Sequence, residues 1–238
     1  MTKHANLAIL VTFSLISVGV LAWVFLNRSG YLYDLEWMEG GMLMHAVRLS
    51  EGKALYGPPT TEFVPYFYTP GYPAIVALLG KVFGISYALG RGVSIVATIG
   101  IMWLIFSAIK REASWQYGLV GVGVYAVLFR TNGAFYDLAR PDSLFLALVL
   151  WAMYLTRFNR GMRIALLTGA LCALSFLTKQ TASVFFVAIC IVHFARSWKD
   201  GLVCVLSGMG LTVLGCVLLN VWSDGWFWTY IFEGHQGH

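Results

Sequence analysis

The sequence predicts an all-α polytopic membrane protein, and three observations lead to this fold class. Hydrophobic residues make up 59% of the 238 residues and aromatic residues 16%, whereas only 11% are charged. The mean hydropathy of +0.74 is outside the range of ordinary soluble domains. The apolar residues fall into repeated runs of helix length, and the connections between the runs are too short for a soluble domain.

Eight apolar runs can be delimited in chain order. They cover residues 6–27, 72–89, 92–109, 117–129, 143–156, 164–178, 182–195 and 201–222. The first run is too long for a signal peptide and has no small-residue cleavage site, so we expect a retained signal anchor with a cytoplasmic N-terminus. The run 72–89 contains Lys81, follows two prolines and is interrupted by glycines, so it could span the membrane or lie on its surface.

The distribution of basic residues favours the surface position for the run 72–89. If this run does not span, the inner loops carry eight basic and two acidic residues, and the outer side carries eight basic and nine acidic residues. If it does span, every later basic loop moves to the outside, against the positive-inside rule. The sequence therefore predicts seven spans with an inner N-terminus and an outer C-terminus.

We expect one membrane domain over residues 1–238, the N-terminal part of a longer protein. It comprises a first span (1–27), an outer loop (28–90), spans two to seven (91–222) and an outer segment (223–238). Two juxtamembrane helices are expected in the outer loop, the first over about residues 35–51 and ended by Gly52. The formal charge of +5 comes from scattered residues, so nothing indicates nucleic-acid binding.

Three carboxylates stand close together in the first outer loop, at Asp34, Glu36 and Glu39. They could form a solvated turn at the headgroups. Alternatively, Glu36 and Glu39 would share one side of a helix that begins here, and a carboxylate above the membrane could act as a general base or bind a metal. The sequence leaves both interpretations open.

Later outer turns add further charged residues. Asp142 follows Arg140 and Pro141, and it could either cap the next helix or join a site. Lys179 lies in a tight outer turn with Gln180; it could reach the headgroups or neutralise an anionic leaving group. The aromatic tail 226–232 is followed by His235 and His238, which could share a helix face and bind a metal only if the chain end were helical. Gly234 and Gly237 argue against a helix there.

Spans three to seven contain no Asp, Glu, Lys or Arg in their interiors. Ion-coupled transporters usually place ionisable groups in the middle of the membrane. The charged groups here gather on one face, which favours an enzyme acting at the outer interface on a lipid-linked substrate. A transporter or lipid flippase segment is the alternative, and a purely structural subunit is a third.

The order of these features resembles the GT-C membrane glycosyltransferases. The nearest branch is family 39, with the protein O-mannosyltransferases, aminoarabinose transferases and lipopolysaccharide galacturonosyltransferases. The matching segments are Asp34 to Glu39, Arg48 to Gly52, Tyr68 to Pro73, Phe83-Gly84, Arg91, Arg140 to Ser143, Thr178-Lys179 and Phe227 to His235.

The resemblance implies a GT-C-like helical bundle and sugar transfer, with inversion, from a polyprenyl-phosphate donor to a lipid, glycan or protein acceptor. The implied catalytic residues are Asp34, Glu36, Glu39 and Asp142, with Asp34 favoured as general base. Substrate contacts are expected from Arg91, Arg140, Lys179, Gln180, Tyr68 and His235.

Tyr68 stands where the aminoarabinose branch has a metal-binding glutamate. We therefore expect no metal ligands and no cofactor, and a divalent metal is not favoured. The expected location is the bacterial inner membrane, with the active face extracytoplasmic.

Overall fold

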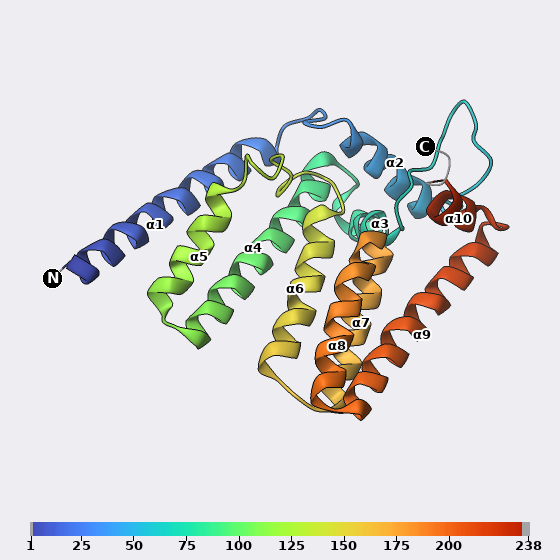
Figure 1. Cartoon of the computed structure of the whole chain (residues 1–238). Helices are drawn as coiled ribbons and strands as arrows, with labels where there is room; N and C mark the ends of the chain where they lie inside the picture. The colour runs from blue at the N-terminus through green and yellow to red at the C-terminus, as the bar shows by residue number, and fades with distance from the viewer. Residues whose placement is uncertain (1, 235–238) are drawn as a thin grey trace.

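The computed structural model describes the backbone of residues 2–234 and the side chains of residues 5–234. In this part of the chain every regular element is helical, as the sequence predicts (Figure 1). The helices are α1 (Thr2–Ser29), α2 (Met38–Ser50), α3 (Gly71–Phe83), α4 (Tyr87–Glu112), α5 (Trp115–Val127), α6 (Asp142–Phe158), α7 (Met162–Thr178), α8 (Ser183–Arg196), α9 (Trp198–Trp222) and α10 (Trp226–Trp228), with the short turns η1 (Gln180–Ala182) and η2 (Thr229–Glu233).

Each of the seven runs expected to cross the membrane forms a helix. Among the described residues, three helices are long and apolar enough to span a bilayer: Ala5–Ser29, Tyr87–Glu112 and Trp198–Trp222. The remaining ones are shorter, so the count of seven spans and their orientation stay predictions. The protein has the architecture of a helical membrane protein.

The two short helices expected in the first loop correspond to α2 and α3. The first begins at Met38, three residues later than expected, and Gly52 follows its end with a φ of +73°. The second ends before Gly84, which has a φ of +74°. Glycine adopts this left-handed conformation without the steric cost that a Cβ would add. Their position relative to the bilayer stays a prediction.

The long helices lie side by side, and their connections alternate between two ends of the molecule (Figure 1). Helix α1 packs on α5, α4 packs between α5 and α6, and α7 packs between α6 and α9. Small residues permit the closest approaches. A Cβ on Gly169 of α7 would collide with the backbone of Cys204 and Gly208 on α9, and such small-residue contacts are typical of helices packed in membranes.

Two hydrophobic clusters hold the first loop above the helix ends. Met38, Met42 and Ala46 of α2 pack against Tyr72 and Val76 of α3. The segment after α2 is anchored separately, because its buried side chains pack against the chain end that follows α9. That second cluster consists of Leu55, Tyr56, Phe227, Tyr230 and Ile231. The loop therefore has a defined position over α4, α6 and α7.

Candidate active site

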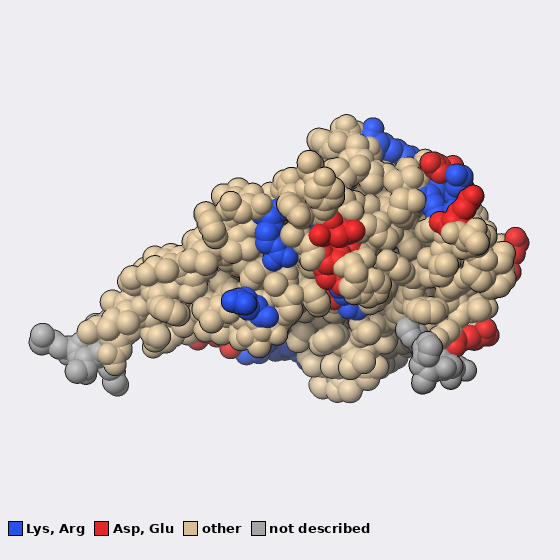
Figure 2. Space-filling model, turned by 90° about the horizontal axis from the view of Figure 1, so that it is seen from above, with Lys and Arg blue, Asp and Glu red and all other residues tan. Residues whose placement is uncertain are grey.

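Charged side chains gather at the end of the molecule where α1 leads into α2. Seen from this end, acidic and basic groups lie beside one another on a surface that is otherwise mostly uncharged (Figure 2). The segment between Gly30 and Trp37 crosses this end and carries Asp34 and Glu36. Glu39 follows in the first turn of α2.

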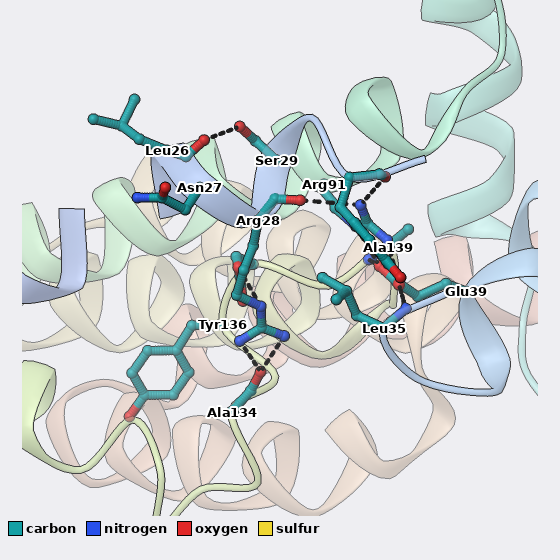
Figure 3. A network of polar contacts seen from close by, with 12 residues as sticks. Leu26, Asn27, Arg28, Ser29, Leu35, Glu39, Arg91, Ala134, Tyr136 and Ala139 are labelled. Atoms are coloured by element: carbon teal, nitrogen blue, oxygen red, sulfur yellow. Dashed lines mark hydrogen bonds and ion pairs between the residues drawn. The ribbon is translucent and has the colours of Figure 1, made fainter. Parts of the chain in front are cut away.

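Glu39 is fully buried and lies at the centre of a hydrogen-bond network (Figure 3). Arg91 of α4 donates to both of its carboxylate oxygens, from Nε at 2.9 Å and from Nη2 at 2.7 Å. The backbone N–H groups of Leu35 and Ala139 donate to the same two oxygens at 2.7 and 2.8 Å. One carboxylate thus joins α2, α4, the first loop and the loop before α6.

Arg91 is also fully buried, and all of its guanidinium N–H groups donate hydrogen bonds to other groups of the protein. Beyond its two bonds to Glu39, it donates from Nη1 to the carbonyl oxygens of Arg28 and Tyr31, and from Nη2 to that of Tyr33. A guanidinium has five N–H groups, and these five bonds account for each of them. In this conformation Arg91 has no N–H donor left for a substrate phosphate, and its expected role in substrate binding stays a prediction.

A second buried ion pair lies next to this network. The Asp137 carboxylate is fully buried and lies 3.3 Å from Nε of Arg28, at the end of α1. Neither of its oxygens has a hydrogen-bond partner among the described residues. Burial raises the pKa of Asp137 to about 6, although the charge of Arg28 acts in the opposite direction.

Four of the other expected residues form a row of alternating charges. Glu36 lies 2.7 Å from Nη1 of Arg140, Arg140 Nε lies 3.0 Å from Asp142, and Asp142 lies 2.7 Å from Nζ of Lys179. The four residues come from the first loop, the loop before α6, the start of α6 and the turn after α7. The structure therefore brings together residues that are up to 143 positions apart in the sequence, from Glu36 to Lys179.

Asp142 accepts hydrogen bonds from two cationic side chains, those of Arg140 and Lys179. Asp142 is the first residue of α6 and makes no capping hydrogen bond. Burial alone would raise the pKa of its carboxyl, but the hydrogen bonds and charges of Lys179 and Arg140 outweigh burial and lower that pKa. Asp142 is thus an ionised bridge between two cations.

The Lys179 side chain is directed toward other side chains of the site. Its ammonium group bonds Asp142 and lies 5.5 Å from the ring of Tyr68 and 5.4 Å from that of Phe145. Gln180 donates from Nε2 to the carbonyl oxygen of Phe67 at 2.6 Å, which links the turn after α7 to the first loop.

Asp34 differs from the other three acids because it forms no ion pair in the described structure. Its side chain is exposed, and it accepts a hydrogen bond from the N–H of Gly40 at 2.7 Å. The Tyr87 hydroxyl donates to the same carboxylate. Burial raises the pKa of the Tyr66 hydroxyl, and the negative charges of Glu36 and Asp34 raise it further.

The geometry divides the ten expected residues into three sets. Asp34, Glu36, Arg140, Asp142, Lys179 and Tyr68 lie at or beside the polar surface, with Gln180 holding the adjoining turn. Glu39 and Arg91 form the buried network beneath it. His235 lies outside the described residues, as does His238. The contacts of Tyr66 and Tyr87 with this site had no signal in the sequence, since neither residue belongs to a recognisable motif.

Metal ligands are not clustered in the described part of the chain. No group of three or more His, Cys, Asp or Glu side chains there could hold a metal ion. Three acids of the candidate site form ion pairs instead: Glu36 with Arg140, Asp142 with Lys179, and Glu39 with Arg91. Independence from metals stays a prediction.

Comparison with known protein families matches residues 67–223 to the family described as dolichyl-phosphate-mannose-protein mannosyltransferase. The match covers more than half of the chain. The chain belongs to this family. As a member it is a glycosyltransferase of the GT-C group that uses a polyprenyl-phosphate sugar donor, and it is an integral membrane protein. No curated protein matches the chain, and neither does any solved structure.

The mannosyltransferase family match contains Arg140, Asp142 and Lys179 but begins after the first-loop acids. The resemblance predicted from the order of motifs is therefore confirmed at the level of the family. The roles of Asp34, Glu36 and Glu39 depend on their geometry and on experiment.

Proposed function

We propose that this protein transfers a sugar, with inversion, from a polyprenyl-phosphate donor to a hydroxyl acceptor, using Asp34 as the general base. The observation that carries the proposal is the difference between the four acids. Glu36, Glu39 and Asp142 are each held by a cation at 2.7 Å, whereas Asp34 has none. An exposed carboxylate without a cation is the one most able to accept a proton from a bound hydroxyl.

Two cations retain the donors that a leaving phosphate needs. Lys179 has three N–H donors, of which one is used by Asp142. Arg140 uses Nε for Asp142 and Nη1 for Glu36, and its Nη2 donates to no described residue. Charge-assisted bonds from Lys179 and Arg140 would stabilise the charge that develops on the phosphate as the glycosidic bond breaks.

The buried network gives these groups a fixed position. Arg91 holds the end of α1 through the carbonyl group of Arg28 and the loop that carries Asp34 through those of Tyr31 and Tyr33, and Glu39 holds the loop that carries Arg140 through the N–H of Ala139. We therefore assign Glu39 and Arg91 to positioning the two loops, and Asp142 to orienting Lys179 and Arg140. Pre-organised side chains of this kind are what accurate transfer requires.

The acceptor attacks the anomeric carbon as Asp34 removes its proton. The bond between that carbon and the phosphate oxygen breaks, and polyprenyl phosphate leaves. The face on which this happens is proposed to be extracytoplasmic, in a bacterial inner membrane, because the basic inner loops and the acidic outer loops fit that orientation.

A transfer assay tests this function. The full chain in nanodiscs is supplied with a panel of radiolabelled polyprenyl-phosphate sugars, and transfer is compared between wild type, Asp34→Asn and Glu62→Gln. Glu62 is an exposed acid of the same loop and serves as the matched control. Transfer lost in Asp34→Asn and kept in Glu62→Gln supports the proposal, and equal transfer by both variants refutes Asp34 as base.

A further inference from the structure

His45 joins α2 to the segment that precedes α3. Its imidazole is buried, and each ring nitrogen has one backbone partner. Nδ1 lies 2.6 Å from the carbonyl oxygen of Gly41, and Nε2 accepts a hydrogen bond from the N–H of Tyr66 at 3.0 Å. The Tyr66 ring stacks on the imidazole, with the ring centroids 5.0 Å apart. One side chain therefore links the start of α2 to Tyr66.

The two backbone partners fix the tautomer of His45. A backbone amide can only donate and a backbone carbonyl can only accept, so Nε2 carries the lone pair and Nδ1 carries the proton. The imidazole is therefore neutral in this arrangement. A second proton on Nε2 would place two N–H groups against each other, and the bond to Tyr66 would be lost.

Tyr66 extends this contact to the candidate active site. Asp34 accepts a hydrogen bond from the N–H of Gly40. The Tyr66 hydroxyl lies against Gly41, so closely that a Cβ there would collide with it. The carboxylate and the hydroxyl thus lie over neighbouring glycines of α2, and the Tyr66 ring meets Trp37 edge-on at 5.9 Å. A displacement of Tyr66 would change the surroundings of Asp34.

The bond from His45 secures Tyr66 separately from the rest of its segment. In the described part of the chain, His45 is the one residue that forms a hydrogen bond with Tyr66. Phe63 is held by Arg48, whose guanidinium lies 4.1 Å from the ring centroid, and Arg48 also donates to the carbonyl oxygen of Ala54. Loss of the His45 bond would therefore release Tyr66 and leave the preceding residues in place.

The groups around the imidazole favour its neutral form. Burial is the main cause that lowers its pKa, and the charge of Arg48 on α2 lowers that pKa further, whereas the hydrogen bond at Nδ1 acts in the opposite direction. The segment before α3 contributes the titratable Tyr66 and the exposed Glu62. Beyond Tyr66, the first loop contributes Asp34 and Glu36, whose charges act on the Tyr66 hydroxyl.

We propose that His45 is a positioning residue for the transfer reaction: its neutral imidazole holds Tyr66 beside Asp34, and protonation of Nε2 releases Tyr66. This inference rests on the proposed function, in which Asp34 is the general base, and it assigns to His45 no contact with the substrate. Transfer then requires a neutral His45, so activity is lost as pH falls through the pKa of this residue.

Two substitutions separate the acceptor atom from the aromatic ring. His45→Gln places an amide oxygen within reach of the Tyr66 N–H and does not titrate. His45→Phe keeps an aromatic ring for stacking but has no acceptor. Met44→Gln, at an exposed position of the same helix, is the matched control.

The experiment measures kcat/KM for transfer from the panel of radiolabelled polyprenyl-phosphate sugars, with the full chain in nanodiscs and a solubilised membrane fraction as acceptor. At neutral pH we expect His45→Gln and Met44→Gln to match wild type and His45→Phe to lose about five- to tenfold, the effect of one lost hydrogen bond. On acidification, wild type should lose transfer at a higher pH than His45→Gln, whose remaining acid limb belongs to Asp34.

A second measurement does not depend on activity. In ¹⁵N NMR spectra of histidine-labelled protein at neutral pH, the His45 signals, identified by their absence from His45→Gln, should show the proton on Nδ1. A proton on Nε2 would overturn the inference even if a variant fails to fold.

The kinetic outcomes separate this inference from the function beneath it. Wild-type activity in His45→Phe, an equal loss in both His45 variants, or the same acid limb in wild type and His45→Gln would overturn the positioning role and leave the transferase activity standing. Absence of transfer by wild type across the whole donor panel would reject the proposed function and this inference with it.

Discussion

Arg91 and Glu39 form a buried, two-bond ion pair between α4 and α2, with Nη2 and Oε2 2.7 Å apart. Burial by itself would raise the pKa of Glu39, but the hydrogen bonds from Arg91, Ala139 and Leu35 outweigh it and hold that pKa below its ordinary value. The carboxylate is therefore ionised at neutral pH, and its negative charge balances the positive charge of Arg91 in a fully buried site.

The first prediction concerns the stability of this pair. Glu39→Ala leaves the Arg91 charge buried and unpaired, and breaking a buried pair in this way typically costs about 3–5 kcal/mol. Thermal unfolding in nanodiscs, followed by tryptophan fluorescence, should show a large loss. Asp34→Ala, which removes an exposed acid without an ion pair, is the control and should unfold close to wild type. Equal losses would contradict the assignment of Glu39 as the structural acid.

The second prediction concerns the pH dependence contributed by Asp137. Burial raises the pKa of Asp137 to about 6 in the folded protein, whereas its pKa in the unfolded chain is near 3.9. Between these two pH values the folded state keeps a proton on Asp137 that the unfolded state has already released. The free energy of unfolding should therefore fall as pH rises from about 4 to 6 and then level, by roughly 3 kcal/mol at most.

Asp137→Asn should remove that slope. The charges of Glu39 and Arg91 also act on the pKa of Asp137. The informative quantity is therefore the difference in unfolding free energy between wild type and variant at each pH. A difference that does not change between pH 4 and 7 would show that Asp137 has an ordinary pKa.

The third prediction concerns the cation for the leaving phosphate. Lys179→Met should lower kcat by about 10²–10³, the usual effect of removing one group that stabilises developing negative charge. Asp142 keeps its bond to Arg140 in this variant, so the fold should persist. Lys81→Met, an exposed lysine of α3, is the control. A Lys179→Met variant with wild-type kcat would exclude this lysine from the reaction.

The fourth prediction concerns the contact between Gly41 and Tyr66. A Cβ on Gly41 would collide with the Tyr66 ring and hydroxyl. Gly41→Ala should therefore destabilise the protein by about 1–3 kcal/mol, as overpacking does, and should reduce transfer because Tyr66 lies beside Asp34 and Glu36. Gly30→Ala meets open space and should be neutral. An unchanged melting temperature for Gly41→Ala would argue against this packing.

The sequence predicted the helical class well, because apolar runs and turn residues are local signals. Gly52 follows the end of α2 as expected, and the run 72–89 is divided between two elements, α3 and the first three residues of α4. The partners of the charged residues could not be predicted. Nothing local distinguishes Glu39, which is fully buried, from Asp34, which is exposed five residues earlier. That difference arises from Arg91 and Ala139, which are distant in the sequence and approach Glu39 only in the folded chain.

The role of Asp34 is tested most directly by kcat/KM for sugar transfer in Asp34→Asn and Glu36→Gln, each against wild type. With Asp34 as general base, Asp34→Asn should lose about 10²–10⁴ in kcat/KM, with unchanged thermal stability and donor binding. Glu36→Gln should lose less, because Glu36 acts through Arg140. Full turnover by Asp34→Asn, or a larger loss in Glu36→Gln, would contradict the assignment.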